Sequence, residues 1–316
     1  MMYKNTFKLV ISNFNLVWKI LAYIVLSSIF VVGLAYACSL PIIKLLESEG
    51  MLVTIIGIFK KFGSDFNVYG LLVNIVGLIE DFCTLIAANI SKLWVYIVLF
   101  LFIVIVVRAF LSGIYKFATT NALYNSLSSN IKIGFTTSLF SSIRINLKYQ
   151  LASLLVQLPL DVLLFTLFFY LARWVITTEG LLIIAPITLI IVLMLLFAFK
   201  IVLFSGWIPA IIAFDCGVWK GLKLGIKAVF RRFYRTFSTV ILILLTLLVV
   251  NFVCALCTFG ASFIITIPLT LFTILVFNMT MFYSSQGMRF YVDSDTVVTP
   301  KRLEETDAIS ALKYII

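Results

Sequence analysis

The sequence predicts an all-α polytopic membrane protein, because its composition is too apolar for a water-soluble fold. The AVILMFWYC residues make up 63% of the 316 residues, charged residues make up 12%, and the mean hydropathy is +1.18. An ordinary soluble domain is about half apolar and about a quarter charged. The excess apolar surface must therefore face lipid, which excludes a soluble enzyme, a disordered chain and a secreted disulfide scaffold.

Six stretches are long and apolar enough to cross a membrane, which takes about 20 mostly apolar residues. They cover roughly residues 19–40, 93–112, 149–171, 181–208, 237–258 and 261–283. A weaker stretch, 68–90, carries Glu80 and Asp81 near its centre, and each acid would cost about 2.5–3.5 kcal/mol inside the bilayer. We therefore expect one six-helix transmembrane domain over residues 1–283, with an outer loop at 41–92 and a cytoplasmic tail at 284–316.

The basic residues in the connections predict that both termini are cytoplasmic. Segments 1–19, 113–148 and 209–236 carry many lysines and arginines, with Asp215 as their single acid. The 41–92 loop instead balances the two signs, and the turn at 259–260 is uncharged. Because cytoplasmic loops carry the excess of Lys and Arg, we expect a multi-pass protein of the cell membrane, of the bacterial cytoplasmic type.

Two cytoplasmic segments match each other at an offset of 91 residues. Ile131–Gly134 aligns with Leu222–Gly225, and Arg144 aligns with Arg235. Each segment leads directly into a pair of spans, and Phe7–Ile11 resembles a third, degenerate copy. The alternative is coincidence in an apolar chain of low complexity. We expect three units, each an amphipathic lead-in helix followed by a helical hairpin.

The third lead-in has the clearest amphipathic pattern. Apolar residues recur near helical spacing from Phe214 to Phe233, and Asp215 is placed to cap the start of the helix. Such a helix lies in the membrane interface, with its apolar side in the acyl boundary and its cations among anionic headgroups. The alternative is a plain connector that obeys the positive-inside rule. The candidate lipid contacts are Lys220, Lys223, Lys227, Arg231, Arg232 and Arg235.

The segment Phe204–Ile212, followed by Gly221–Gly225 and a basic run from Arg231 to Arg235, resembles a known bacterial pattern. It is similar to the membrane domain attached to some glycerophosphoryl diester phosphodiesterases, and to stand-alone relatives of that domain. The likeness covers roughly 200–245, with a fainter echo at 115–160. It implies a membrane module of repeated hairpins that works near lipids. In the fused enzymes a separate soluble barrel carries the catalysis, so the resemblance assigns no catalytic residue to this chain.

A few polar residues fall inside the predicted spans, where ionisable groups are costly and often functional. Asp161 lies near the middle of the third span, with Gln157 one turn earlier, and Lys200 lies in the fourth span. With Arg108 and Asn251, these residues are candidates for an ion, proton or solute site in a small secondary transporter. The alternative is structural contact between helices, with the lysine reaching to the surface.

Two cysteines, Cys254 and Cys257, have the CxxC spacing that tunes thiolate reactivity. They are predicted near the oxidising outer side, so a thiol oxidoreductase is a less favoured alternative. Their apolar surroundings favour an inert structural role, since cysteine is a common small buried residue. The chain has no histidine, which argues against serine triads and histidine-ligated metals.

Together these patterns predict a non-enzymatic membrane protein of the accessory or scaffold type, without metal or cofactor. Its expected partners are anionic inner-leaflet lipids and a membrane or cytoplasmic protein. Nucleic acid is not expected, because a net charge of +11 in a membrane protein is typical of loops held against an anionic leaflet.

Overall fold

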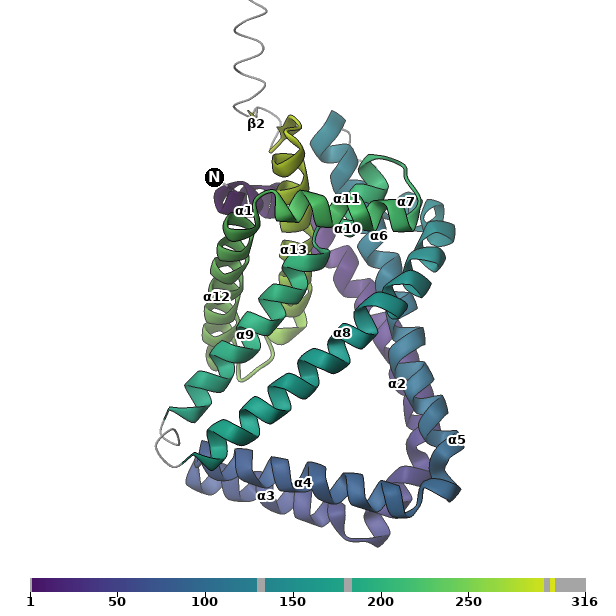
Figure 1. Cartoon of the computed structure of the whole chain (residues 1–316), viewed down its shortest axis with the longest axis vertical. Coiled ribbons are helices and arrows are strands. Elements are labelled where there is room, and N and C mark those ends of the chain that lie inside the picture. Colours follow the sequence, from purple (N-terminus) through teal and green to yellow (C-terminus); the bar gives the residue numbers. More distant parts are fainter. Residues whose placement is uncertain (1, 130–133, 179–183, 293–295, 299–316) are drawn as a thin grey trace, which may run out of the picture. The chain divides into compact units, whose positions relative to one another are not determined.

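A computed structural model describes residues 2–129, 134–178, 184–292 and 296–298, and confirms an all-α polytopic membrane fold (Figure 1). A two-stranded antiparallel pair, β1 (Phe290–Tyr291) with β2 (Val297–Val298), follows the last helix. The helices are α1 (Met2–Ser12), α2 (Asn15–Ser48), α3 (Met51–Asp65), α4 (Val68–Ala88), α5 (Ile90–Leu101), the π-helix η1 (Phe102–Val107), α6 (Arg108–Ser129), α7 (Phe135–Ser141), α8 (Ile143–Thr177), α9 (Ala185–Phe204), α10 (Trp207–Ala213), α11 (Val218–Phe230), α12 (Phe233–Thr258) and α13 (Phe263–Gln286).

Seven helical stretches in the described part are long and apolar enough to cross a membrane. Six of them overlap the predicted spans, and the seventh is α4, Val68–Ala88, which the sequence placed in the outer loop. That loop is largely helical rather than irregular, because α3 and α4 form a hairpin within it. The tail begins with the end of α13 and the β1–β2 pair, and residues 299–316 lie outside the described part.

The chain divides into two compact units. Unit 1 comprises Met1–Leu26, Phe110–Ser153 and Leu195–Ile316, and unit 2 comprises Ser27–Ala109 and Leu154–Met194. The single transmembrane domain expected from the sequence stays a prediction.

The second half of α13 is the centre of unit 1. Phe272, Val276, Met279 and Phe282 on this helix are fully buried, because α1, α10, α11 and α12 all pack against α13. The Thr280 hydroxyl lies 3.1 Å from that of Thr6 on α1. Polar pairs and close packing hold transmembrane helices together, since lipid is as apolar as their side chains. This packing fixes α1 and α11 on the unit.

A short helix, a break and the start of a long helix recur three times in unit 1, as α1–α2, α7–α8 and α11–α12. Residues 131–133 of the second predicted lead-in lie outside the described part of the chain. At two of the breaks, a side chain hydrogen-bonds to the backbone of the preceding turn. The Asn13 amide donates to the Leu9 carbonyl at 3.1 Å, and the buried Ser142 hydroxyl donates to the Ser138 carbonyl at 2.6 Å. Such back-bonding to the preceding turn competes with regular helix and bends it. The third break falls at Arg231 and Arg232.

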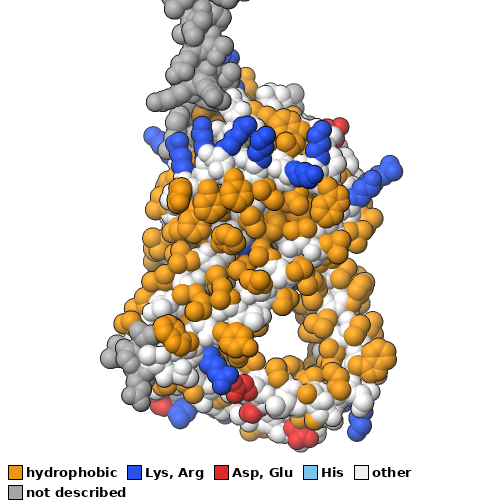
Figure 2. Space-filling model, viewed as in Figure 1, with side chains coloured by type: hydrophobic (Ala, Val, Ile, Leu, Met, Phe, Trp, Pro, Cys, Tyr) orange, Lys and Arg blue, Asp and Glu red, His pale blue; other side chains and the backbone are white. Residues whose placement is uncertain are grey.

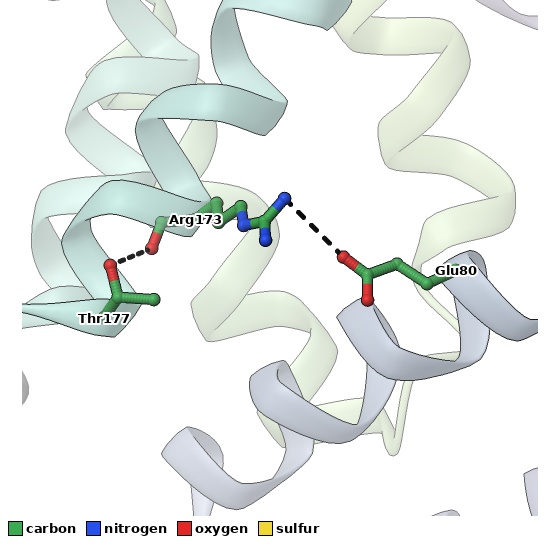
Figure 3. Close-up of polar contacts among 3 residues, drawn as sticks. All are labelled: Glu80, Arg173 and Thr177. Atoms are coloured by element: carbon green, nitrogen blue, oxygen red, sulfur yellow. Dashed lines mark hydrogen bonds and ion pairs between the residues drawn. The ribbon is translucent and has the colours of Figure 1, made fainter.

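Unit 2 buries few side chains. Its main cluster joins Leu72 and Val76 of α4 to the end of α8 and the start of α9, through Phe168, Ala172, Val175, Ala185 and Leu189. Arg173 and Glu80 approach to 3.9 Å beside this cluster, with 58% and 53% of their side chains exposed (Figure 3). The Thr177 hydroxyl donates to the Arg173 carbonyl at 3.0 Å and completes the last turn of α8. An exposed pair of this kind contributes about 0–1 kcal/mol, so the apolar cluster carries the contact.

Candidate lipid-binding surface

The α10–α11 pair is the support of the candidate surface. The backbones of Gly206, just before α10, and Gly225 on α11 are in direct contact. A Cβ on Gly225 would lie only 2.6 Å from the Gly206 carbonyl carbon. One turn away, Gly221 faces Ile211. The Trp207 indole donates to the Val218 carbonyl at 2.9 Å and closes the pair. Gly221 and Gly225 have GxxxG spacing, which lets two helices approach closely.

The turn between α10 and α11 differs from its prediction. The Asp215 side chain does not cap α11, because Gly217 occupies the capping position and the Asp215 backbone is left-handed with φ of 42°. The Cys216 thiol donates to the Ala210 carbonyl at 3.5 Å. Burial raises the pKa of this thiol, although nearby Lys220 partly lowers it. Cys216 is therefore a structural thiol of the turn.

The apolar side of α11 packs on protein rather than on lipid. Val218 and Val229 were expected in the acyl boundary, but both are buried in unit 1. Leu222 and Phe233 are half-buried, and Phe214 is exposed as expected. The prediction was wrong for the valines because a helical period reports a buried side without reporting what covers it.

The cations of α11 and of the break that follows all remain exposed. Figure 2 shows a band of Lys and Arg side chains on the face of unit 1 that carries α1 and α11, beside a broad apolar surface. The large apolar side chains among them, Trp219, Phe230 and Tyr234, are exposed too. Aromatic rings and cations are typical anchors at a membrane interface. The exposed cations here are Lys220, Lys223, Lys227, Arg231, Arg232 and Arg235.

The two units differ in the balance of their acidic and basic residues. Among the described residues of unit 1, Asp215 is the one acid, whereas the basic residues come from α1, α2, α6, α8, α9, α11, α12 and the connections. The described residues of unit 2 are balanced: Lys44, Lys60, Lys61, Lys92, Arg108 and Arg173 stand against Glu47, Glu49, Asp65, Glu80, Asp81 and Asp161. A surface of one sign attracts the opposite charge over a distance comparable to the Debye length, so unit 1 has the surface suited to an anionic leaflet.

The predicted intramembrane residues fall in both units. Gln157 and Asp161 lie one turn apart on α8 in unit 2, where α8 continues through Pro159. Arg108, at the start of α6, is exposed in unit 2. Lys200 and Asn251 belong to unit 1, and the Asn251 amide donates to the Thr270 hydroxyl of α13 at 3.2 Å. Asn251 thus serves helix packing, and the transport site stays a prediction from the sequence.

A pair of buried amide side chains in unit 1 was not identified from the sequence. Asn146 and Gln150, one turn apart on α8, are buried against Gly113 of α6. The Gln150 amide donates to the Asn146 side-chain oxygen at 3.3 Å, and the Asn146 amide donates to the Phe110 carbonyl at 3.4 Å. The spacing of Asn146, Gln150 and Ser153 could have indicated this pair, because it places three polar residues on one side of a helix.

The cysteine pair lies at the C-terminal end of α12. Cys254 is half-buried, Cys257 is exposed, and both thiols are free. Reactive CxxC motifs gain thiolate character at a helix N-terminus or beside cations, and α12 ends at Thr258, one residue after Cys257. A redox role for the two cysteines remains a prediction from the sequence. Their position at the C-terminal end of α12 does not favour it.

The five tryptophans differ in their surroundings. The Trp207 side chain is 1% exposed and is a core residue of unit 1. Trp18, Trp94, Trp174 and Trp219 are exposed, as is typical of tryptophans that anchor a protein at a membrane interface. No protein-family model, curated protein or solved structure matches this chain.

Proposed function

We propose that this chain is a non-enzymatic membrane protein of the accessory or scaffold type, which binds anionic lipids of the inner leaflet through the basic face of unit 1. The observation that carries the proposal is the fixed, exposed row of cations on α11, opposite the glycine face that packs on α10. The row lies in the segment that resembles the membrane domain of glycerophosphoryl diester phosphodiesterases, and we propose a membrane module of that kind.

Fixing the helix strengthens lipid binding, because ordering groups at the moment of binding costs free energy. A lone amphipathic helix must fold at the interface, whereas α11 is already folded on α10 and α13. Each cation near an anionic surface contributes about 1 kcal/mol. Several cations on one rigid face therefore give a strong preference for anionic lipid.

Packing in unit 1 supports six crossings rather than seven. Leu9 of α1, Phe135 of α7 and Phe290 beyond α13 belong to one hydrophobic cluster. If α4 crossed the bilayer, three crossings would separate α1 from α7 and would put them on opposite faces, about 30 Å apart. With α2 and α5–α6 as the two crossings between them, all three segments lie on one face, which we infer to be cytoplasmic.

Packing in unit 2 supports the same topology. Glu80 pairs with Arg173, which lies four residues before the end of α8. At 1.5 Å per residue, Glu80 is then level with a point about 6 Å from the end of that span. This depth is close to water, so Glu80 escapes the cost of a charge at the bilayer centre. We therefore propose that α3 and α4 lie at the outer surface.

The topology predicts where introduced cysteines react. In a background with the native cysteines replaced, Lys4→Cys on α1 and Phe140→Cys on α7 should react with a membrane-impermeant maleimide from the same side, only after permeabilisation. Both positions are exposed, so access depends on the side of the membrane. Labelling of one from outside and the other from inside would show that α4 crosses the bilayer.

The lipid proposal predicts a loss of anionic preference in Lys223→Ala/Lys227→Ala. At about 1 kcal/mol per cation, the preference for phosphatidylglycerol over phosphatidylcholine should fall roughly tenfold or more, as measured by competition in detergent micelles. High salt should weaken the preference of the unaltered protein. Lys60→Ala/Lys61→Ala, a pair on α3 that is also exposed, is the matched control. Equal effects of the two double variants would contradict the proposal.

A further inference from the structure

The α11–α12 break gathers cations from two parts of the chain. Val229 and Phe233, on either side of the break, pack in one cluster with Met2, Tyr3 and Phe7 of α1. This contact brings Lys4 of α1 to the region of the break, which itself bears Lys227, Arg231 and Arg232. We name this region, Lys4, Lys227, Arg231 and Arg232, the basic corner.

The basic corner is electrostatically uncompensated by the described protein around it. Asp215, the one acid among the described residues of unit 1, lies at the opposite end of α11. Like charges one turn apart, such as Lys227 and Arg231, repel each other and destabilise a helix. A bound polyanion would relieve this repulsion, and one with two phosphates would engage cations on both sides of the break at once.

An aromatic ridge leads from the basic corner along the side of α12. The rings of Phe230 and Phe233 stack at 5.8 Å with an interplanar angle of 16°, and those of Phe233 and Phe237 stack at 5.8 Å with an angle of 10°. Phe230 is 61% exposed, while Phe233 and Phe237 are half-buried. A ridge of this kind offers apolar contact to the acyl chain of a lipid. A soluble phosphate compound has no acyl chain and gains nothing from the ridge.

We propose that the basic corner and the Phe230–Phe233–Phe237 ridge form a binding site for a lipid with two phosphate groups. The phosphates contact Lys227, Arg231 and Arg232, with Lys4 of α1 beside them, and an acyl chain lies along the ridge. Two phosphates on one headgroup bind more tightly than two separate monophosphate lipids, because the second contact is intramolecular. This inference rests on the proposed function, since it specifies which anionic lipid unit 1 selects.

The test compares diphosphatidylglycerol with phosphatidylglycerol, at equal total phosphate, for binding to the detergent-solubilised full chain. The unaltered protein should bind diphosphatidylglycerol about tenfold more tightly per phosphate, within the range that linked contacts allow. Arg231→Ala/Arg232→Ala should abolish this selectivity. Lys220→Ala/Lys223→Ala, which removes the same charge from the other end of α11, should weaken both lipids and leave the selectivity unchanged.

Two further arms identify the source of the phosphates. Phe230→Ala keeps every cation and should weaken diphosphatidylglycerol severalfold, while soluble pyrophosphate at matched concentration should compete poorly. Equal affinity for the two lipids, or equal selectivity in the two double variants, would overturn the site and leave the general anionic preference standing. Efficient competition by pyrophosphate would overturn the lipid assignment. No preference for either lipid over phosphatidylcholine would overturn the proposed function itself.

Discussion

Gly225→Ala is expected to lower the stability of the protein more than a methyl addition at an open helical position such as Gly63. The new Cβ would lie 2.6–2.8 Å from three backbone atoms of Gly206 and Trp207, including the Gly206 carbonyl carbon. Backbone atoms cannot rotate away, so α10 and α11 must separate. Overpacking of this kind costs about 1–3 kcal/mol, and separation also strains the Trp207–Val218 hydrogen bond. The midpoint of thermal unfolding in detergent should fall by several degrees.

Two companion variants make this result specific. In Gly221→Ala the new Cβ meets the Ile211 side chain at 2.4 Å, so Gly221→Ala should cost much less stability when residue 211 is already alanine. The same Ile211→Ala change should not rescue Gly225→Ala, where the obstacle is backbone. Gly63→Ala on α3 meets nothing within 4 Å and is the control. If Gly225→Ala is as stable as Gly63→Ala, the close glycine contact is wrong, and with it the fixed presentation of α11.

The sequence predicts the class of this fold because lipid requires long apolar helices, and composition reports them directly. It does not predict the break inside the fourth span. The candidate span runs from Ala185 to Ala213, but it is interrupted between α9 and α10 at the point where Gly206 packs on Gly225. That contact joins residues 19 positions apart through the fold, so no local pattern near residue 204 reveals it.

The candidate surface could be predicted in its charge but not in its orientation. The six cations lie where their spacing put them, and all are exposed. Val229 and Trp207 are buried in protein, although lipid would suit the same apolar residues equally well. Hydrophobic periodicity does not distinguish lipid from another helix. The GxxxG spacing of Gly221 and Gly225 held the missing information, because small residues at that spacing indicate a helix partner.

Gly113→Ala is expected to destabilise unit 1 through the buried amide pair. The added Cβ would lie 1.6 Å from the Gln150 amide nitrogen and 2.3 Å from the Asn146 side-chain oxygen. The Gln150 side chain must therefore move, which breaks its 3.3 Å hydrogen bond to Asn146. A buried polar group left without a partner costs about 1–3 kcal/mol. The free energy of unfolding in detergent should fall by that amount.

A double-mutant cycle separates this mechanism from a general packing defect. Gln150→Ala removes the side chain that Gly113→Ala displaces, so the double variant should be about as stable as Gln150→Ala alone. The coupling between the two changes should then equal the cost of Gly113→Ala itself, about 1–3 kcal/mol, as for residues in direct contact. Additive losses would mean that Gly113 and Gln150 do not touch. Coupling of the expected size would instead identify Gly113 as the position that lets α6 and α8 approach, since a glycine there leaves room for two buried amides that any larger residue would displace.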